Sequence, residues 1–163
     1  DGEAHIGCIE AGGRTVAAMA HGLETVYPAA HREIAERMLE LRGALVSEYP
    51  PGTKARPNFF VERDRLQSGL SLGVIVVETD IEGGTMHTVG FAAKQGRPVA
   101  ALNHPSSMLS EPKSRGNQSL IRAGQATALG EVKDLSTFFE GLSGRAPLSQ
   151  RLAPSKGSQG MLF

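Results

Sequence analysis

Two arginines stand close together in a segment whose chemistry suits phosphate binding. Arg63 and Arg65 belong to the stretch Phe60-Val-Glu-Arg-Asp-Arg65, near the start of an expected helix. A guanidinium group donates paired hydrogen bonds to phosphate oxygens, so arginine is well suited to this contact. The neighbouring Glu62 and Asp64 can instead take up both arginines in ion pairs. The segment therefore predicts either a phosphate contact or an internal cluster of ion pairs.

A second candidate is the basic stretch from Lys113 to Gln118, which opens another expected helix. It contains Arg115, Gly116 and Asn117. Backbone N–H groups at a helix N-terminus carry partial positive charge, and they favour an anion at that end. The same composition is also typical of an ordinary surface loop.

A glycine-rich turn, Gly83-Gly84-Thr85, follows the most apolar of the expected strands. Glycine permits close approach of the backbone to a ligand, and the Thr85 hydroxyl can cap a helix or bind a phosphate. The turn has no P-loop lysine and does not match G-x-G-x-x-G. It is thus either a nucleotide or phosphate site, or a plain helix start. Nearby carboxylates would repel a phosphate, and they can also bind sugar hydroxyls, hold a hydrated metal ion or be solvated: Glu78, Asp80 and Glu82.

No nucleophile, base and orienting group form a recognisable catalytic set. The five histidines have no second ligand at a spacing typical of metal sites, which argues against zinc. Cys8 is the single cysteine, so it cannot form an internal disulfide. Ser47 and Ser71 lack the G-x-S-x-G surroundings of a hydrolase nucleophile. We therefore expect no metal, no cofactor and no catalytic residue.

Short apolar runs alternate with helical patterns along the chain, and these elements must position the candidate residues. Strands alternating with helices predict right-handed βαβ units around a parallel sheet, so the fold class is α/β. The strand at 73–77 is apolar on both alternating faces, which predicts helices covering both of its sides. In the helix after it, Met86, Val89 and Ala93 are expected to face the core. We expect strands at 15–20, 44–47, 73–77, 99–102 and 126–129, and helices at 28–42, 58–70, 84–95, 116–123 and 135–142.

Length and composition limit the classes of protein. The 163 residues suit one domain, expected over 1–143, followed by a flexible tail rich in Pro, Ser and Gly over 144–163. Hydrophobic residues make up 40% and no apolar run approaches a membrane span, so we expect no membrane partner. Seventeen basic residues balance seventeen acidic ones, so an anion site must be local. Few aromatic residues and no Trp disfavour RRM and OB platforms. The single cysteine and the absence of a leader favour the cytoplasm.

Six motifs in the same order resemble the DprA/Smf family of bacterial DNA-processing proteins. Each motif is short, but six in one order are specific, and they extend from Asp1 to about Ala128. The matching stretches are 1–5 (the end of the family's G-x-D-x-x-A-H), 13–16 (G-R-T-I/V), 22–28 (G-L-x-x-x-Y-P), 47–52 (S-E-x-P-P-G), 60–65 with 69–71 (F-x-x-R-N-R-x-x-x-x-L-S) and 116–124 (G-x-N-x-L-I-x-x-G).

The resemblance implies a Rossmann-like three-layer sandwich with a mostly parallel sheet. It also implies a non-enzymatic protein that binds single-stranded DNA, forms a homodimer and helps to load a RecA-type recombinase during DNA uptake and natural transformation. The family's first strand and its S-G-x-A-x-G turn would precede Asp1, so the chain resembles the latter part of the domain. The implied DNA-binding residues are Arg63, Arg65, Arg115, Gly116 and Asn117.

Two positions depart from the family pattern, and a related family supplies an alternative. Asp64 stands where the family has Asn, and the turn after the central strand has Glu-Gly-Gly-Thr85 where the family has S-G-S, which disfavours DNA at that turn. The alternative is a nucleotide or nucleotide-derived ligand on Gly83, Gly84 and Thr85, as in LOG-type phosphoribohydrolases. Their P-G-G-x-G-T-x-x-E pattern ends in a glutamate that this chain lacks, which weakens an enzymatic interpretation.

Overall fold

The computed structural model describes residues 1–143, and the predicted tail at 144–163 lies outside the described residues. Helices and strands alternate as the α/β prediction requires. All five predicted strands and all five predicted helices are present; the strand at 99–102 has the predicted bounds, and each of the others differs at one or both ends. The elements are α1 (Gly2–Glu10), β1 (Val16–Ala18), η1 (Ala29–His31), α2 (Arg32–Glu40), β2 (Ala44–Val46), α3 (Pro57–Leu70), β3 (Val74–Val76), α4 (Thr85–Lys94), β4 (Val99–Leu102), η2 (Ser106–Met108), α5 (Pro112–Arg122), β5 (Thr127–Leu129) and α6 (Val132–Ser143).

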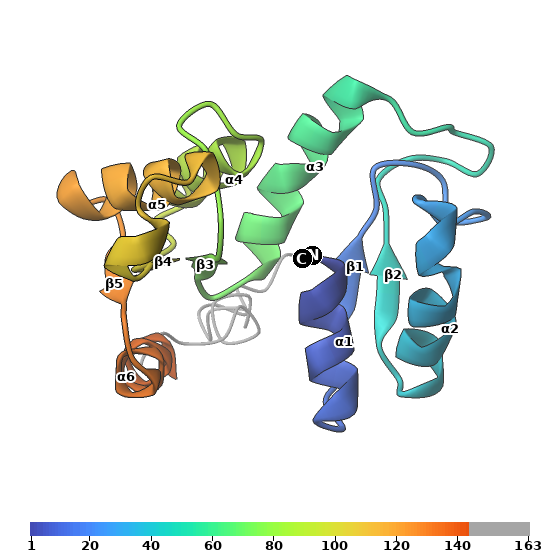
Figure 1. Cartoon of the computed structure of the whole chain (residues 1–163). Coiled ribbons are helices and arrows are strands. Elements are labelled where there is room, and N and C mark those ends of the chain that lie inside the picture. The colour runs from blue at the N-terminus through green and yellow to red at the C-terminus, as the bar shows by residue number, and fades with distance from the viewer. Residues whose placement is uncertain (144–163) are drawn as a thin grey trace, which may run out of the picture.

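The strands are parallel and form two sheets. β1 pairs with β2, and β3, β4 and β5 form a second sheet in that order. Figure 1 shows β1 and β2 with α1 and α2 on one side of α3, and β3, β4 and β5 with the remaining helices on the other side. The helix α3 therefore connects two α/β halves.

The three-stranded half is a three-layer sandwich. On one face of the sheet, Val76 and Ala101 pack with Leu120 of α5 and with residues of α4. On the other face, Ala100 packs with Phe138 of α6. Alternate strand residues point to opposite faces, so the two helix layers bury the two faces separately. The predicted Rossmann-like sandwich with parallel strands is confirmed.

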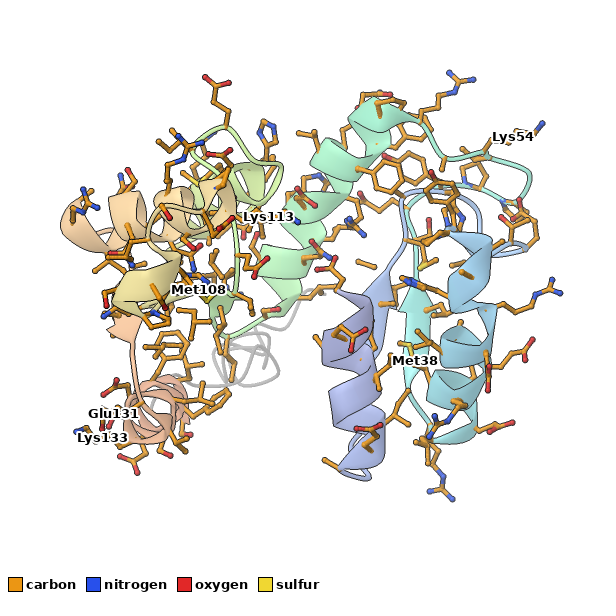
Figure 2. All side chains as sticks on the ribbon, viewed as in Figure 1. Met38, Lys54, Met108, Lys113, Glu131 and Lys133 are labelled. Carbon is orange, nitrogen blue, oxygen red and sulfur yellow. The ribbon has the colours of Figure 1, made fainter. Side chains whose placement is uncertain are left out.

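The two-stranded half packs around α2. Met38 is 2% exposed and points from α2 toward β2 (Figure 2), and α1 packs against α2. A cavity of about 590 Å³ lies between this half and α3, and most of its lining side chains are apolar, including Val16, Phe60 and Leu66. No helix within residues 1–143 has both the length and the hydropathy needed to cross a membrane.

The strand β3 differs from its prediction. Val76 is 1% exposed, but Ile75 and Val77 are 38% and 61% exposed. β3 pairs with β4 alone and so forms an edge of its sheet. Ile75 lies beside Ala100 on the face that packs against α6, and within residues 1–143 this helix leaves the β3 end of that face partly open. Helices therefore lie on both sides of the sheet, as predicted, but the cover of β3 is incomplete on the α6 side.

Three helical details also differ. The helix α1 was not expected, and α5 begins at Pro112, four positions before the predicted start. Proline suits the first helical turn, because a backbone N–H at that position would have no partner within the helix. In α4, Ala92 is fully buried, whereas Ala93 is exposed, so the inward prediction for Ala93 is wrong by one residue.

Candidate functional site

Arg65 lies exposed on α3, close to the carboxyl end of the two-stranded sheet. Its Nη2 donates a hydrogen bond to Oε2 of Glu48, which lies two residues after β2. The two side chains are 46% and 48% exposed. This hydrogen bond with Glu48 raises the pKa of Arg65, so the guanidinium stays charged. Arg65 can therefore offer donors to an anion from solvent.

Arg63 is placed differently, because its side chain is only 15% exposed. Its Nη1 donates to the carbonyl oxygen of Ala18 at 2.6 Å, and its Nε donates to Oδ1 of Asp64 at 3.3 Å. The guanidinium also lies 5.8 Å from the ring centroid of Phe60. Arg63 thus ties α3 to the end of β1, and Asp64, where the family pattern has Asn, helps to hold it.

The loop after β2 is fixed against α3. The Ser47 hydroxyl donates to the carbonyl of His21 at 2.7 Å and accepts from the backbone N–H of Tyr49 at 3.0 Å. The Tyr49 ring stacks on Phe59, with centroids 4.3 Å apart, and its hydroxyl donates to Glu62 at 2.9 Å. Burial, followed by this hydrogen bond with Glu62, raises the pKa of Tyr49. Sequence reasoning missed this aromatic contact, although both rings are adjacent to predicted motifs.

Arg115 occupies the first turn of α5, and it lies beside the turn after β3. Its Nη2 is 3.7 Å from Oδ2 of Asp80, and the two side chains are 53% and 43% exposed. Backbone hydrogen bonds join the two segments: the Thr79 N–H donates to Lys113, and the Gly116 N–H donates back to Thr79, at 2.8 and 2.9 Å. The start of α5 and the end of β3 therefore form one rigid unit.

Gly116 and Asn117 lie beneath this surface. A Cβ on Gly116 would be 2.5 Å from the Thr79 carbonyl oxygen, so only glycine allows this approach. The Asn117 side chain is fully buried; its Oδ1 accepts from the Thr79 N–H at 3.0 Å, and its Nδ2 donates to Val77 and Leu102 at 2.8 and 3.0 Å. Gly116 holds the start of α5 against the turn after β3, Asn117 joins the carboxyl ends of β3 and β4, and only Arg115 of this predicted group is exposed.

The turn with Gly83, Gly84 and Thr85 forms the start of α4. Gly84 precedes the helix with φ −53°, a conformation open to any residue, and a Cβ there would meet no atom within 4 Å. Oδ1 of Asp80 accepts a hydrogen bond from the Ile81 N–H at 2.7 Å. These contacts are those of an ordinary turn, and the space beside Gly84 is open.

Further cations lie near these segments. Lys54, Arg56 and Lys113 are exposed and form no ion pair with any other described residue. Figure 2 shows Lys54 on the loop before α3, pointing away from the ribbon. Within residues 1–143, no group of three His, Cys, Asp or Glu side chains is placed to hold a metal ion.

Comparison with known proteins gives the family. The family model for DNA recombination-mediator protein A matches residues 1–140. The chain is 40% identical over 124 residues to the protein Smf of Escherichia coli, covering 76% of this chain and 32% of that protein. It is 38% identical over 135 residues to the DNA processing protein DprA of Bacillus subtilis, covering 83% and 44%. The chain thus spans less than half the length of these relatives.

Solved structures show the same fold. The X-ray structure of DprA from Streptococcus pneumoniae matches with a TM-score of 0.70 and 31% identity, over 82% of this chain and 46% of that one. A DprA structure from Helicobacter pylori, described for its single-stranded DNA binding mode, matches with a TM-score of 0.65 and 19% identity, over 86% and 74%. With the family model matching nearly all the described residues, the chain belongs to the DNA recombination-mediator protein A (DprA/Smf) family.

Proposed function

We propose that the chain contributes a binding surface for single-stranded DNA to a recombination mediator. The observation that carries the proposal is the pair of exposed arginines, Arg65 and Arg115, at the carboxyl ends of the strands in a chain of this family. The carboxyl ends of parallel strands are where α/β proteins usually bind ligands. Contacts to phosphates rather than bases would make the binding independent of sequence and sensitive to salt.

The five predicted residues have different roles in this proposal. Arg65 and Arg115 contact phosphates directly, because solvent reaches their guanidinium groups. Arg63 positions α3 against β1, and Gly116 and Asn117 position the first turn of α5, because their contacts are internal. The zero net charge of the whole chain makes these local cations decisive for affinity.

The partners of the full mediator follow from the family. The DprA of Helicobacter pylori was described for binding single-stranded DNA, and we extend that ligand to this chain. We also propose a homodimer, a RecA-type recombinase as protein partner in DNA uptake and natural transformation, a cytoplasmic location, and a binding rather than catalytic role. These assignments rest on the family membership.

The direct test measures binding of a fluorescein-labelled oligothymidylate by anisotropy at low salt. Arg65→Ala and Arg115→Ala are each expected to weaken binding about three- to tenfold, since each removes one exposed phosphate contact. Lys133→Ala is the matched control, because it also removes one positive charge. Lys133 lies on α6, and Figure 2 shows it away from Lys54 and Lys113. Equal effects of all three substitutions, or no binding by the unmodified chain, would exclude the proposed surface.

A further inference from the structure

Each arginine predicted to contact DNA already has a carboxylate partner in this chain. Arg65 pairs with Glu48, Arg115 lies 3.7 Å from Asp80, and Arg63 pairs with Asp64. The first two pairs matter for binding because both partners are about half exposed, so an incoming anion can reach them. DNA binding at this surface therefore replaces an existing interaction at each exposed arginine.

We propose that Glu48 and Asp80 compete with DNA phosphates for Arg65 and Arg115, and that this competition limits affinity and selects for polyanions. The inference rests on the proposed function and concerns the same surface. At each arginine, a carboxylate leaves the guanidinium group and a phosphate oxygen takes its place. One monovalent anion exchanges for another, so the net gain in direct attraction is small.

The structure holds Glu48 ready for this competition. Its neighbour Ser47 is bonded to the His21 carbonyl, and its other neighbour Tyr49 is fixed by stacking on Phe59 and by a hydrogen bond to Glu62. A carboxylate on such a loop loses little conformational freedom when it pairs with an arginine. Glu48 is thus an efficient internal substitute for phosphate.

Asp80 is also fixed, but its competition is weaker. Its Oδ1 accepts from the Ile81 N–H at 2.7 Å, which orients Oδ2 toward Arg115. The 3.7 Å separation exceeds a hydrogen-bond distance, so the attraction is ionic without a formed hydrogen bond. We expect Asp80 to restrain Arg115 less than Glu48 restrains Arg65.

This exchange favours a chain of phosphates over an isolated one. A nucleic acid strand carries condensed counterions, and their release on binding drives association at low salt. A free phosphate carries no such layer, so it gains little by displacing a carboxylate that is already in place. The paired carboxylates therefore make the surface selective for a polymer, such as single-stranded DNA.

The test uses variants in which an amide replaces a carboxylate, so each variant raises the net charge of the chain by one unit. Glu48→Gln and Asp80→Asn remove the competing charges, and the Asn amide oxygen can still accept from Ile81. Glu82→Gln is the matched control. Glu82 lies in the same turn as Asp80, is exposed and forms no ion pair with another described residue. At low salt we expect oligothymidylate affinity to rise about two- to fivefold for Glu48→Gln, about twofold for Asp80→Asn, and less for Glu82→Gln.

A double-mutant cycle separates competition from general charge repulsion. In an Arg65→Ala background, Glu48→Gln is expected to leave DNA affinity unchanged, because the arginine that it frees is absent. Inorganic phosphate is expected to displace DNA at lower concentration from Glu48→Gln than from the unmodified chain. An equal gain from Glu82→Gln, or a gain from Glu48→Gln that persists without Arg65, would overturn the competition. If DNA binds but Glu48→Gln changes nothing, the competition alone is wrong; if neither the chain nor any variant binds DNA, the proposed function fails as well.

Discussion

Asn117 lies fully buried beneath the start of α5, where its amide group joins two strands and a turn. It accepts one hydrogen bond from the Thr79 N–H and donates to backbone carbonyls of Val76, Val77 and Leu102. Asn117→Ala removes the amide donor from the three carbonyl groups and leaves the Thr79 N–H bonded to Lys113 alone. We expect the free energy of unfolding to fall by about 3 kcal/mol, measured by urea denaturation.

A neighbouring amide supplies the control for Asn117. Gln118 makes one side-chain hydrogen bond, to the exposed Asn103. Gln118→Ala is expected to cost less than about 1 kcal/mol, since water can replace that bond. Similar stabilities for the two alanine variants would show that Asn117 does not organise the carboxyl ends of β3 and β4.

His5 makes stability depend on pH. Its pKa is lowered from the ordinary value of 6.5, first by burial, then by the positive amino terminus and by His31. Below pH 6.5 the unfolded chain takes up a proton more readily than the folded chain, so stability is expected to fall with acidification through this window. Urea denaturation across pH measures the slope. His5→Asn is expected to flatten it, and an unchanged slope in that variant would assign the effect to other groups.

At the scale of elements, the candidate anion contacts on three helices differ in position: Arg65 lies beyond the middle of α3 rather than near its predicted start, Gly84 precedes α4, and Arg115 lies in the first turn of α5. The start of α4 has no arginine, and the space beside Gly84 is open. A substitution at Gly84 therefore tests the nucleotide alternative. Gly84→Val is expected to fold normally, because φ is −53° and a Cβ meets no atom within 4 Å. We expect it to leave oligothymidylate affinity unchanged, measured by anisotropy.

The same variant tests a mononucleotide directly. If the alternative ligand binds at the N-terminus of α4, calorimetry detects AMP binding to the unmodified chain and none to Gly84→Val. A thermal melt verifies that both proteins are folded. Loss of DNA binding in a folded Gly84→Val protein would move the DNA surface from Arg65 and Arg115 to the α4 turn.

The elements could be predicted from sequence because their apolar periodicity is local. All five strands have compact apolar runs, whereas the proline that begins α5, Pro112, lies before the predicted start of that helix. The exposure of Ile75 could not be predicted, since it depends on which strand lies beside β3 rather than on the strand's own residues. The helix α1 also has too weak an apolar stripe to stand out, with Ile9 as its only buried residue.

For the candidate site, the sequence motifs singled out residues but did not show where their side chains lie. Arg63 and Arg65 are two positions apart and on one helix, yet one is bonded to the β1 carbonyl of Ala18 and the other is exposed. That difference depends on the position of β1, which is distant in sequence. Asn117 likewise was predicted as a ligand contact, but its partners come from β3 and β4, and only the tertiary structure brings them together.

At the scale of the whole molecule, the two sheets leave apolar side chains exposed along the strand edges. Leu70, Ile75 and Val77 near β3 are 65%, 38% and 61% exposed, and Val16 of β1 is 55% exposed. Exposed strand edges with apolar side chains favour association. We expect self-association that increases with protein concentration, measured by sedimentation velocity.

A charge on the edge is expected to oppose this association. Val77→Lys places a charge beside β3 and is expected to shift the protein toward monomer, as lysine does on natural edge strands. Val132→Lys is the control, because Val132 is 82% exposed at the start of α6 and follows β5, the strand at the opposite edge of the sheet from β3. If both substitutions act equally, or neither does, association does not involve the β3 edge.

We propose that two local arginines, in a chain without net charge, bind DNA phosphates. The most direct measurement is the affinity for labelled oligothymidylate across a series of salt concentrations. The two phosphate contacts of Arg65 and Arg115, at about 0.7 counterions each for single strands, predict a slope of about −1.4 in a plot of log affinity against log salt. A slope near zero, or no detectable binding at low salt, would contradict the claim.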